Sequence, residues 1–135
     1  MTGASDIPVH IRSDQDIVLA RQRGRSLAIE LGFSEGDATL IATAISELAR
    51  NIVCYAGKGL ITLQTLNSCS RKGIQVRASD RGPGIADVRQ ALQDGYSTSG
   101  SLGIGLPGVR RLMDEFQINS SAGKGTTITV RKWKP

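Results

Sequence analysis

DRGPGIADVRQALQDGYSTSGSLGIGLPGV, residues 80–109, holds seven of the sixteen glycines in this 135-residue chain. Glycine lacks a Cβ, so a segment this rich in it either stays loose or lets the backbone come close to a ligand. Asp80 ends a β-rich run, a Ser/Thr/Gly loop spans 96–101, and Pro107 suits the first turn of a helix. We interpret this order of parts as a nucleotide pocket with a mobile lid.

The flanking sequence predicts an α+β fold in a single domain over residues 1–135. Ser13 with Asp16 and Ser34 with Asp37 match capping boxes, and each is followed by apolar residues at helical spacing. Alternating and β-rich runs predict strands between the helices. The predicted helices span 14–31, 35–56, 86–94 and 107–116, and the predicted strands span 7–12, 60–66, 73–79, 117–121 and 126–133.

Composition narrows the function classes. Seventeen basic and twelve acidic residues give a formal charge of +5, which suits an anionic ligand. Because the basic residues are scattered and aromatic residues make up only 4%, we expect no nucleic acid partner. Without a membrane-spanning run or a signal-peptide pattern, we expect a cytoplasmic protein with no membrane partner. Cys54 and Cys69 have neither metal-ligand nor disulfide spacing, which predicts reduced thiols.

Glu47 and Asn51 form the first candidate pair for chemistry. They lie four residues apart in the second predicted helix, so both project from one face beside its apolar stripe. A carboxylate can accept a proton in a transfer step, and an amide oxygen is a ligand that suits Mg²⁺. On their own the two residues also fit an ordinary polar helix face.

Asp80 is the second candidate, at the end of a strand and separated from Gly82-Pro83-Gly84 only by Arg81. Its carboxylate would lie at the rim of the sheet, where it could accept a hydrogen bond from the amino group of a base. Gly84 would let a flat ring come close to the backbone. The alternative is a simple Asp-Gly turn.

Gly103-Ile-Gly105-Leu-Pro-Gly108 satisfies the G-x-G-x-x-G pattern of dinucleotide sites. That fingerprint requires a strand directly before it and an acidic residue on the next strand, and neither is present. The chain also lacks a P-loop and the eukaryotic kinase signatures. A glycine loop leading into a helix N-terminus remains, and its free N–H groups favour phosphate.

Four segments occur in an order that resembles the N, G1, G2 and G3 boxes of the GHKL ATPases. They are ELARN (47–51), DRGPG (80–84), GSLGIGLPG (100–108) and GKGTT (123–127). More narrowly, DGYSTSGSLGIGLPGVRRLMDEF and the Lys-Trp ending are similar to the RsbT-type serine/threonine switch kinases of the stressosome, which belong with the anti-sigma-factor kinases. The resemblance implies the Bergerat fold, a two-layer α+β sandwich with a mixed, mostly antiparallel sheet covered on one face by helices.

The resemblance also implies roles for single residues, with ATP and Mg²⁺ as cofactors. Glu47 would be the general base, Asn51 would hold Mg²⁺ through its side-chain oxygen, and Asp80 would bind the adenine amino group. The remaining nucleotide-binding residues would complete the base pocket or close over the phosphates. They are Gly82, Gly84, Ile85, Ser97, Thr98, Ser99, Gly100, Leu102, Gly103, Gly105 and Thr126.

Partners follow from the same resemblance. Such a kinase phosphorylates STAS-domain scaffold proteins on Ser or Thr and, once released, activates a downstream PP2C-type phosphatase. No lysine or arginine lies between Tyr96 and Val109, so the predicted lid offers no cation to the γ-phosphate. Arg110, Arg111 and Lys124 are candidates for this role, and the alternative is that they are ordinary surface charges. The alternative function is an ATP-binding module, similar to an anti-sigma factor, without significant kinase turnover. A regulatory protein whose kinase activity is secondary also remains open.

Overall fold

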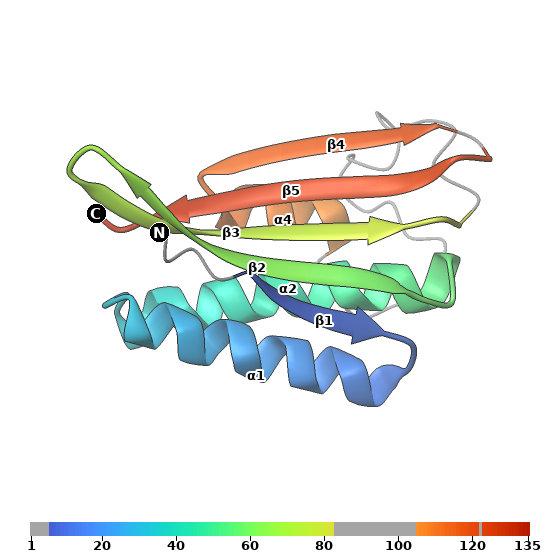
Figure 1. Ribbon diagram of the computed structural model, residues 1–135, viewed down its shortest axis with the longest axis horizontal. Helices are drawn as coiled ribbons and strands as arrows, with labels where there is room; N and C mark the ends of the chain where they lie inside the picture. Colours follow the sequence, from blue (N-terminus) through green and yellow to red (C-terminus); the bar gives the residue numbers. More distant parts are fainter. Residues whose placement is uncertain (1–5, 83–104, 122) are drawn as a thin grey trace.

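The computed structural model describes residues 6–82, 105–121 and 123–135. These residues form a five-stranded sheet whose four neighbouring pairs are all antiparallel. The sequence predicts a mixed, mostly antiparallel sheet, and in the described part every pair of neighbouring strands is antiparallel. In spatial order the strands are β1 Ile7–Ile11, β2 Gly59–Ser68, β3 Arg71–Asp80, β5 Gly125–Trp133 and β4 Glu115–Ser121 (Figure 1).

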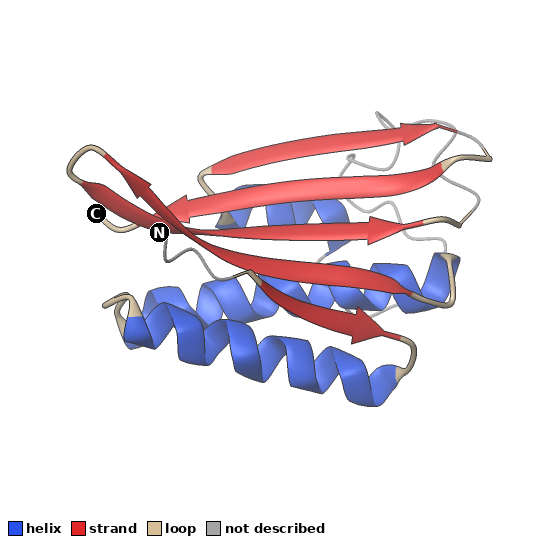
Figure 2. Cartoon of the chain, viewed as in Figure 1, coloured by secondary structure: helices blue, strands red, loops and turns tan. Residues whose placement is uncertain are grey.

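The helices of the described part lie on one face of this sheet, and the other face carries none (Figure 2). They are α1 Asp14–Glu30, α2 Glu35–Tyr55 and α4 Gly105–Leu112. Alternate strand residues such as Val9, Ile61, Val76 and Val130 point toward the helices and are buried. The predicted two-layer α+β architecture is confirmed.

Helix α2 is the centre of the core. Its predicted apolar stripe, Ile41, Ile45, Leu48 and Ile52, is almost fully buried, as a period of 3.6 residues requires of a helix lying on a sheet. Helix α1 packs closely on it, because a Cβ added to Gly24 would overlap the Ile45 side chain. The polar face of α2 is thereby held in a fixed direction relative to the sheet.

Capping residues and apolar spacing in the sequence correctly located α1 and α2, but the predicted cap at Ser13 was wrong. The Oγ of Ser34 accepts the N–H of Asp37 at 3.1 Å, as its capping box predicts. At Ser13 the side chain accepts no such bond; instead the carboxylate of Asp16 accepts the N–H of Arg12 at 2.9 Å. The helix begins as predicted because the acidic side chain takes an orphan donor just outside the first turn.

Two predicted boundaries were wrong. The polar run between β2 and β3 is mostly strand: Asn67 pairs with Lys72, and the chain reverses over two residues, with Cys69 at a φ of 53°. Helix α4 begins at Gly105, so Pro107 lies in its first turn as predicted. The helix ends at Leu112, however, and Phe116 lies in β4 rather than in the helix. Cys54 and Cys69 are free and exposed.

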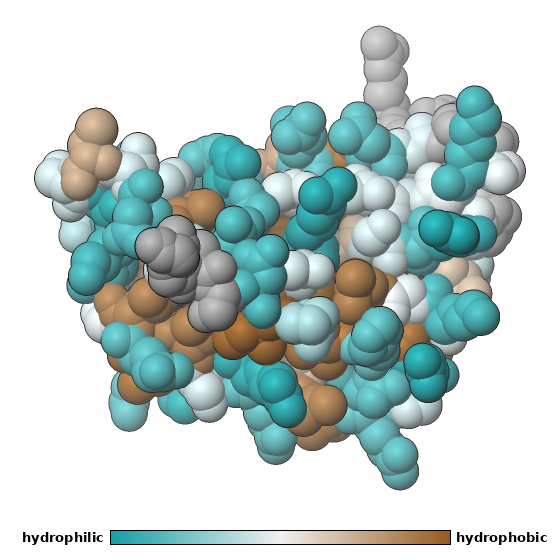
Figure 3. All heavy atoms as spheres, in the orientation of Figure 1, coloured by the Kyte–Doolittle hydropathy of each residue, from teal (hydrophilic) through white to brown (hydrophobic). Residues whose placement is uncertain are grey.

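The surface differs between the layers. In the orientation of Figure 1, hydrophilic side chains cover most of the sheet over β3, β4 and β5, whereas hydrophobic surface gathers toward α1 and β1 (Figure 3). Exposed apolar side chains on α1 include Val18, Leu19 and Ile29. Within the described residues we find no helix with the length and hydropathy needed to pass through a bilayer.

Candidate nucleotide and phosphoryl-transfer site

Glu47 is held between two elements. It lies in α2 with its side chain only 10% exposed. One carboxylate oxygen, Oε1, accepts the backbone N–H of Gly105 at 3.0 Å, at the first residue of α4. The other, Oε2, pairs with the guanidinium of Arg50, one turn further along α2. The candidate base is therefore fixed in direction by one partner from its own helix and one from the start of α4.

Asn51 lies one turn after Glu47 on the same side of α2 and is half-buried. Within residues 6–82, 105–121 and 123–135, no three His, Cys, Asp or Glu side chains gather into a metal site. Mg²⁺ uses few protein ligands and completes its shell with water and substrate phosphates. An amide oxygen beside a carboxylate fits this chemistry, so Asn51 and its neighbourhood suit a magnesium ion that arrives with a nucleotide.

Asp80 ends β3 on the face that the helices cover, two residues after the buried Ala78. Its Oδ1 accepts the N–H of Gly82 at 2.9 Å, which fixes the turn that leaves the sheet. Among the described residues, its Oδ2 has no hydrogen-bond donor. This oxygen is available to accept a hydrogen bond, and the predicted contact with the amino group of a base stays a prediction.

Thr126 lies directly opposite Asp80 in the register of β3 and β5 and is 7% exposed. Its hydroxyl shares a hydrogen bond of 2.8 Å with that of Ser120 on β4. The structure thus brings Asp80 and Thr126 together at one end of the sheet. Since the Ser120 hydroxyl also reaches the Gly125 carbonyl at 3.1 Å, the position of Thr126 is set by its neighbours.

Three glycines let the strand ends and the end of α2 pack closely around Asp80. A Cβ on Gly59 would lie 2.8 Å from Ile52 Cγ2 and 3.2 Å from Asp80 Cβ, and one on Gly82 would lie 2.6 Å from the Cβ of Ala56. Gly125 has a φ of 89°, and a Cβ there would overlap the Asp80 carbonyl oxygen. The end of α2 and the rim of β2, β3 and β5 therefore share one site wall.

Sequence reasoning missed the tight packing at Gly59 and Gly125 and the pairing of Arg50 with Glu47. The i, i+3 spacing of Glu47 and Arg50 was a usable signal for the pair, but the glycine contacts follow only from the register. Eight predicted nucleotide-binding residues lie outside the described part of the chain. They are Gly84, Ile85, Ser97, Thr98, Ser99, Gly100, Leu102 and Gly103. The predicted helix over 86–94 also lies outside the described residues.

Comparisons with known proteins agree with this geometry. The family model of the histidine kinase-like ATPase domain matches residues 12–132. The serine/threonine-protein kinase RsbT of Bacillus subtilis (strain 168) is 57% identical over 125 residues, covering 93% of this chain and 94% of the relative. The anti-sigma F factor of Thermoanaerobacter sp. (strain X514) is 32% identical over 99 residues, covering 69% of this chain and 68% of that protein.

Solved structures show the same fold at low identity. The mycobacterial sensor histidine kinase MprB superposes with a TM-score of 0.57 at 16% identity, covering 97% of this chain and 99% of that chain. The catalytic domain of the histidine kinase ThkA gives 0.54 at 14% identity, with 98% and 97% covered. The chain belongs to the histidine kinase-like ATPase family, and within it to the serine/threonine-protein kinases of the RsbT type.

Proposed function

We propose that the chain transfers the γ-phosphate of ATP to serine or threonine hydroxyls of partner proteins, acting in the cytoplasm. The observation that carries the proposal is the placement of Glu47. It is nearly buried, bonded to the first N–H of α4, and one turn from Asn51. A glutamate beside a helix N-terminus and an amide oxygen provides a proton acceptor next to groups that favour phosphate.

Each proposed role corresponds to a different part of the site. Asn51 would hold Mg²⁺, which supplies charge stabilisation to the phosphates when bound. Asp80 would accept the adenine amino group through Oδ2, with Thr126 and Gly82 at the same end of the sheet. The residues over 84–85 and 97–103 would complete the pocket and close over the phosphates.

Phosphoryl transfer requires a substrate hydroxyl to donate to Glu47. Each carboxylate oxygen of Glu47 already accepts one hydrogen bond and has a second lone pair that can accept another. The hydroxyl oxygen then forms its bond to the γ-phosphorus as the bond to the β,γ-bridging oxygen breaks, and ADP leaves with that oxygen. Glu47 takes the hydroxyl proton. A base in this position contributes about 10²- to 10⁴-fold to the rate.

We also propose specific classes of partner protein. We propose STAS-domain proteins of a stressosome as substrates and a PP2C-type phosphatase as the effector that the released kinase activates. The similarity to RsbT supports the kinase class, and the anti-sigma F relatives support a role in which partners compete for one protein.

The test is incubation of the chain with Mg-ATP and candidate STAS-domain proteins, followed by mass spectrometric mapping of phosphoserine and phosphothreonine. We expect wild-type transfer, and a fall of about 10²- to 10⁴-fold in Glu47→Gln with ATP affinity retained. Glu35→Gln is the matched control, because Glu35 is an exposed residue at the start of the same helix. Full transfer by Glu47→Gln would exclude Glu47 as the base.

A second candidate is an ATP-dependent binding module that captures a sigma factor with little turnover. It is favoured by the 32% identity to an anti-sigma F factor. Its signature would be ATP-dependent sigma capture by the wild type and by Glu47→Gln alike, with no phosphorylated partner.

A further inference from the structure

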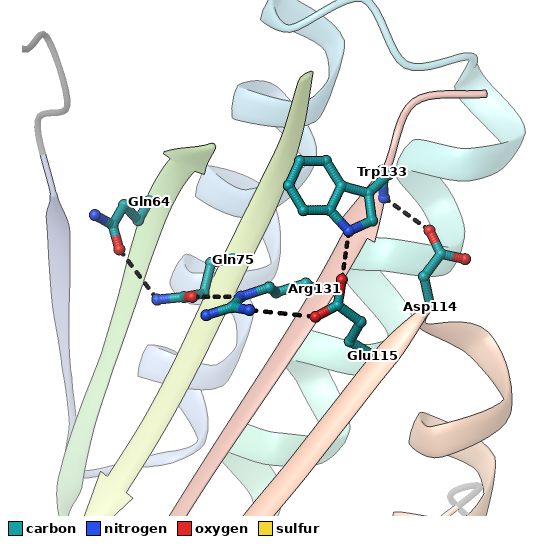
Figure 4. A network of polar contacts seen from close by, with 6 residues as sticks. All are labelled: Gln64, Gln75, Asp114, Glu115, Arg131 and Trp133. Carbon is teal, nitrogen blue, oxygen red and sulfur yellow. Dashed lines mark hydrogen bonds and ion pairs between the residues drawn. The ribbon is translucent and has the colours of Figure 1, made fainter. Parts of the chain in front are cut away.

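A row of polar side chains crosses the uncovered face of the sheet (Figure 4). Gln64, Gln75, Arg131 and Glu115 are register partners on four successive strands. Each is bonded to the next, at 3.0 Å from Gln75 to Gln64, 2.8 Å from Arg131 to Gln75, and 3.2 Å from Arg131 to Glu115. The row fixes Glu115 beside the end of β5.

Trp133, the single tryptophan of the chain, is held at the end of this row. Its indole N–H donates to Glu115 Oε2 at 2.6 Å, and its backbone N–H donates to Asp114 Oδ2 at 2.8 Å. The Arg71 guanidinium lies 4.7 Å from the centre of its ring. A Cβ on Gly73 of the neighbouring strand would lie 2.8 Å from the ring. A half-exposed aromatic ring is therefore held in one orientation by neighbours on three sides.

A basic hollow opens beside this tryptophan, between the β2–β3 turn and the last residues of the chain. Its volume is about 580 Å³, and its lining, here called the hairpin-end cleft, consists of Ser70, Arg71, Lys72, Lys134 and Pro135. The Lys134 N–H donates to the Lys72 carbonyl at 2.8 Å, which ties the two sides together. Within the described residues, neither Lys72 nor Lys134 has an ion-pair partner.

We propose that the hairpin-end cleft and the adjacent Trp133 dock an acidic segment of a partner protein. The basic residues Arg71, Lys72 and Lys134 line one hollow. The Arg71 guanidinium also lies over the Trp133 ring. Tryptophan and arginine are enriched among the residues that contribute most to protein–protein binding. Single-stranded nucleic acid fits less well, because it uses several rings in succession and this end of the sheet offers one.

This surface lies away from the proposed nucleotide site. Arg71 and Asp80 are the first and last residues of β3, and nine strand steps of about 3.3 Å separate them by about 30 Å. The docked segment and the nucleotide can thus bind at the same time. The inference does not depend on the kinase activity, since it concerns a different end of the sheet.

The probe is a labelled oligoglutamate peptide, titrated into the full chain at low salt and followed by anisotropy and by Trp133 fluorescence. The key variant is Lys72→Ala/Lys134→Ala, and its matched control is Arg21→Ala/Arg23→Ala, which removes the same charge from exposed positions on α1. ATP affinity and the unfolding temperature of both variants show that the nucleotide site and the fold are intact.

We expect the peptide to bind the wild type and to change Trp133 fluorescence. Its affinity should fall about 2- to 30-fold in Lys72→Ala/Lys134→Ala, the range for two exposed charge contacts. The control should bind as the wild type does. Equal weakening in both variants would mean general charge attraction and would overturn the proposal. So would failure of the wild type to bind, or tighter binding of oligothymidylate through the same two lysines.

Discussion

Glu47 has a hydrogen-bond partner on each carboxylate oxygen, and the two partners belong to different segments. Gly105 comes from the start of α4, whereas Arg50 lies on the same helix and is 39% exposed. Arg50 also precedes Asn51 directly. Through its ion pair, Arg50 helps to set the direction of the Glu47 carboxylate.

Replacement of Arg50 by alanine should lower kcat about 10- to 100-fold, because a small displacement of a catalytic group is costly in rate. ATP affinity should stay near that of the wild type. Arg50→Lys, which keeps a cation, should recover part of the loss. Steady-state kinetics with separate kcat and KM values measure the split, and an unchanged kcat in Arg50→Ala would show that Glu47 needs no such partner.

Asp80 offers a second test at the residue scale, because its two oxygens have different tasks. Asp80→Asn keeps an acceptor for the Gly82 N–H but presents an amide N–H₂ where the adenine amino group would donate. We expect ATP binding weaker by ~1.5 to 3 kcal/mol, the range for a hydrogen bond to a charged group, at nearly unchanged stability. Calorimetric titration and urea unfolding measure the two quantities. Wild-type ATP affinity would place the adenine elsewhere.

At the scale of elements, the turn between β4 and β5 limits how the site wall can vary. Gly123 and Gly125 both have positive φ, at 80° and 89°. A Cβ on Gly123 would meet nothing within 4 Å, whereas one on Gly125 would overlap the Asp80 carbonyl. Substitution of Gly123 therefore tests the cost of the backbone conformation alone, whereas substitution of Gly125 adds the cost of a steric clash.

Gly123→Ala should lower the free energy of unfolding by about 1 kcal/mol, the cost of a left-handed conformation for alanine. Gly125→Ala should lower it by about 2 kcal/mol more, because the strand ends must also separate. Urea unfolding of both variants measures the difference. An equal decrease in the free energy of unfolding in both variants would show that the ends of β3 and β5 move apart without loss of stability.

Elements were predictable where their signals are local. Ser34 caps α2 and the apolar stripe of α2 repeats every turn, so this helix was placed from sequence. Phe116 fits the spacing of the preceding apolar residues, yet the chain leaves the helix before it. The Asp114 N–H bonds the Arg131 carbonyl and the Asp114 carboxylate bonds the Trp133 N–H. Those partners are distant in sequence, so helical spacing could not reveal that boundary.

At the scale of the whole molecule, we propose a different function for each end of the sheet. One end gathers Asp80, Thr126 and the end of α2, and the other carries Trp133 with the hairpin-end cleft. The motifs in the sequence predicted the candidate residues of the first end but not their contacts, which depend on register. At the second end the sequence singled out only the Lys-Trp ending, because the residues around Trp133 come from β3, β4, β5 and the final residues together.

The row across the sheet predicts a pH effect. The indole N–H of Trp133, and then Arg131, hold the pKa of Glu115 below its ordinary value. The stabilisation is therefore complete above the ordinary glutamate pKa and is lost as the pH falls through the lowered folded value. Trp133 fluorescence should change as the pH falls below the ordinary pKa of a glutamate, and Glu115→Gln should remove that step. Exposed Glu30→Gln is the control, and an unaltered step in Glu115→Gln would assign it to another group.

The bond from Gly105 to Glu47 has a consequence for a kinase that waits for its partner. A carboxylate held by two donors keeps one direction, so it can activate only a hydroxyl that lies along that direction. Nucleotide held beside it would thus be hydrolysed slowly by loosely placed water until a partner protein brings its hydroxyl into that position. Idle copies of such an enzyme would remain loaded and ready, without draining cellular ATP.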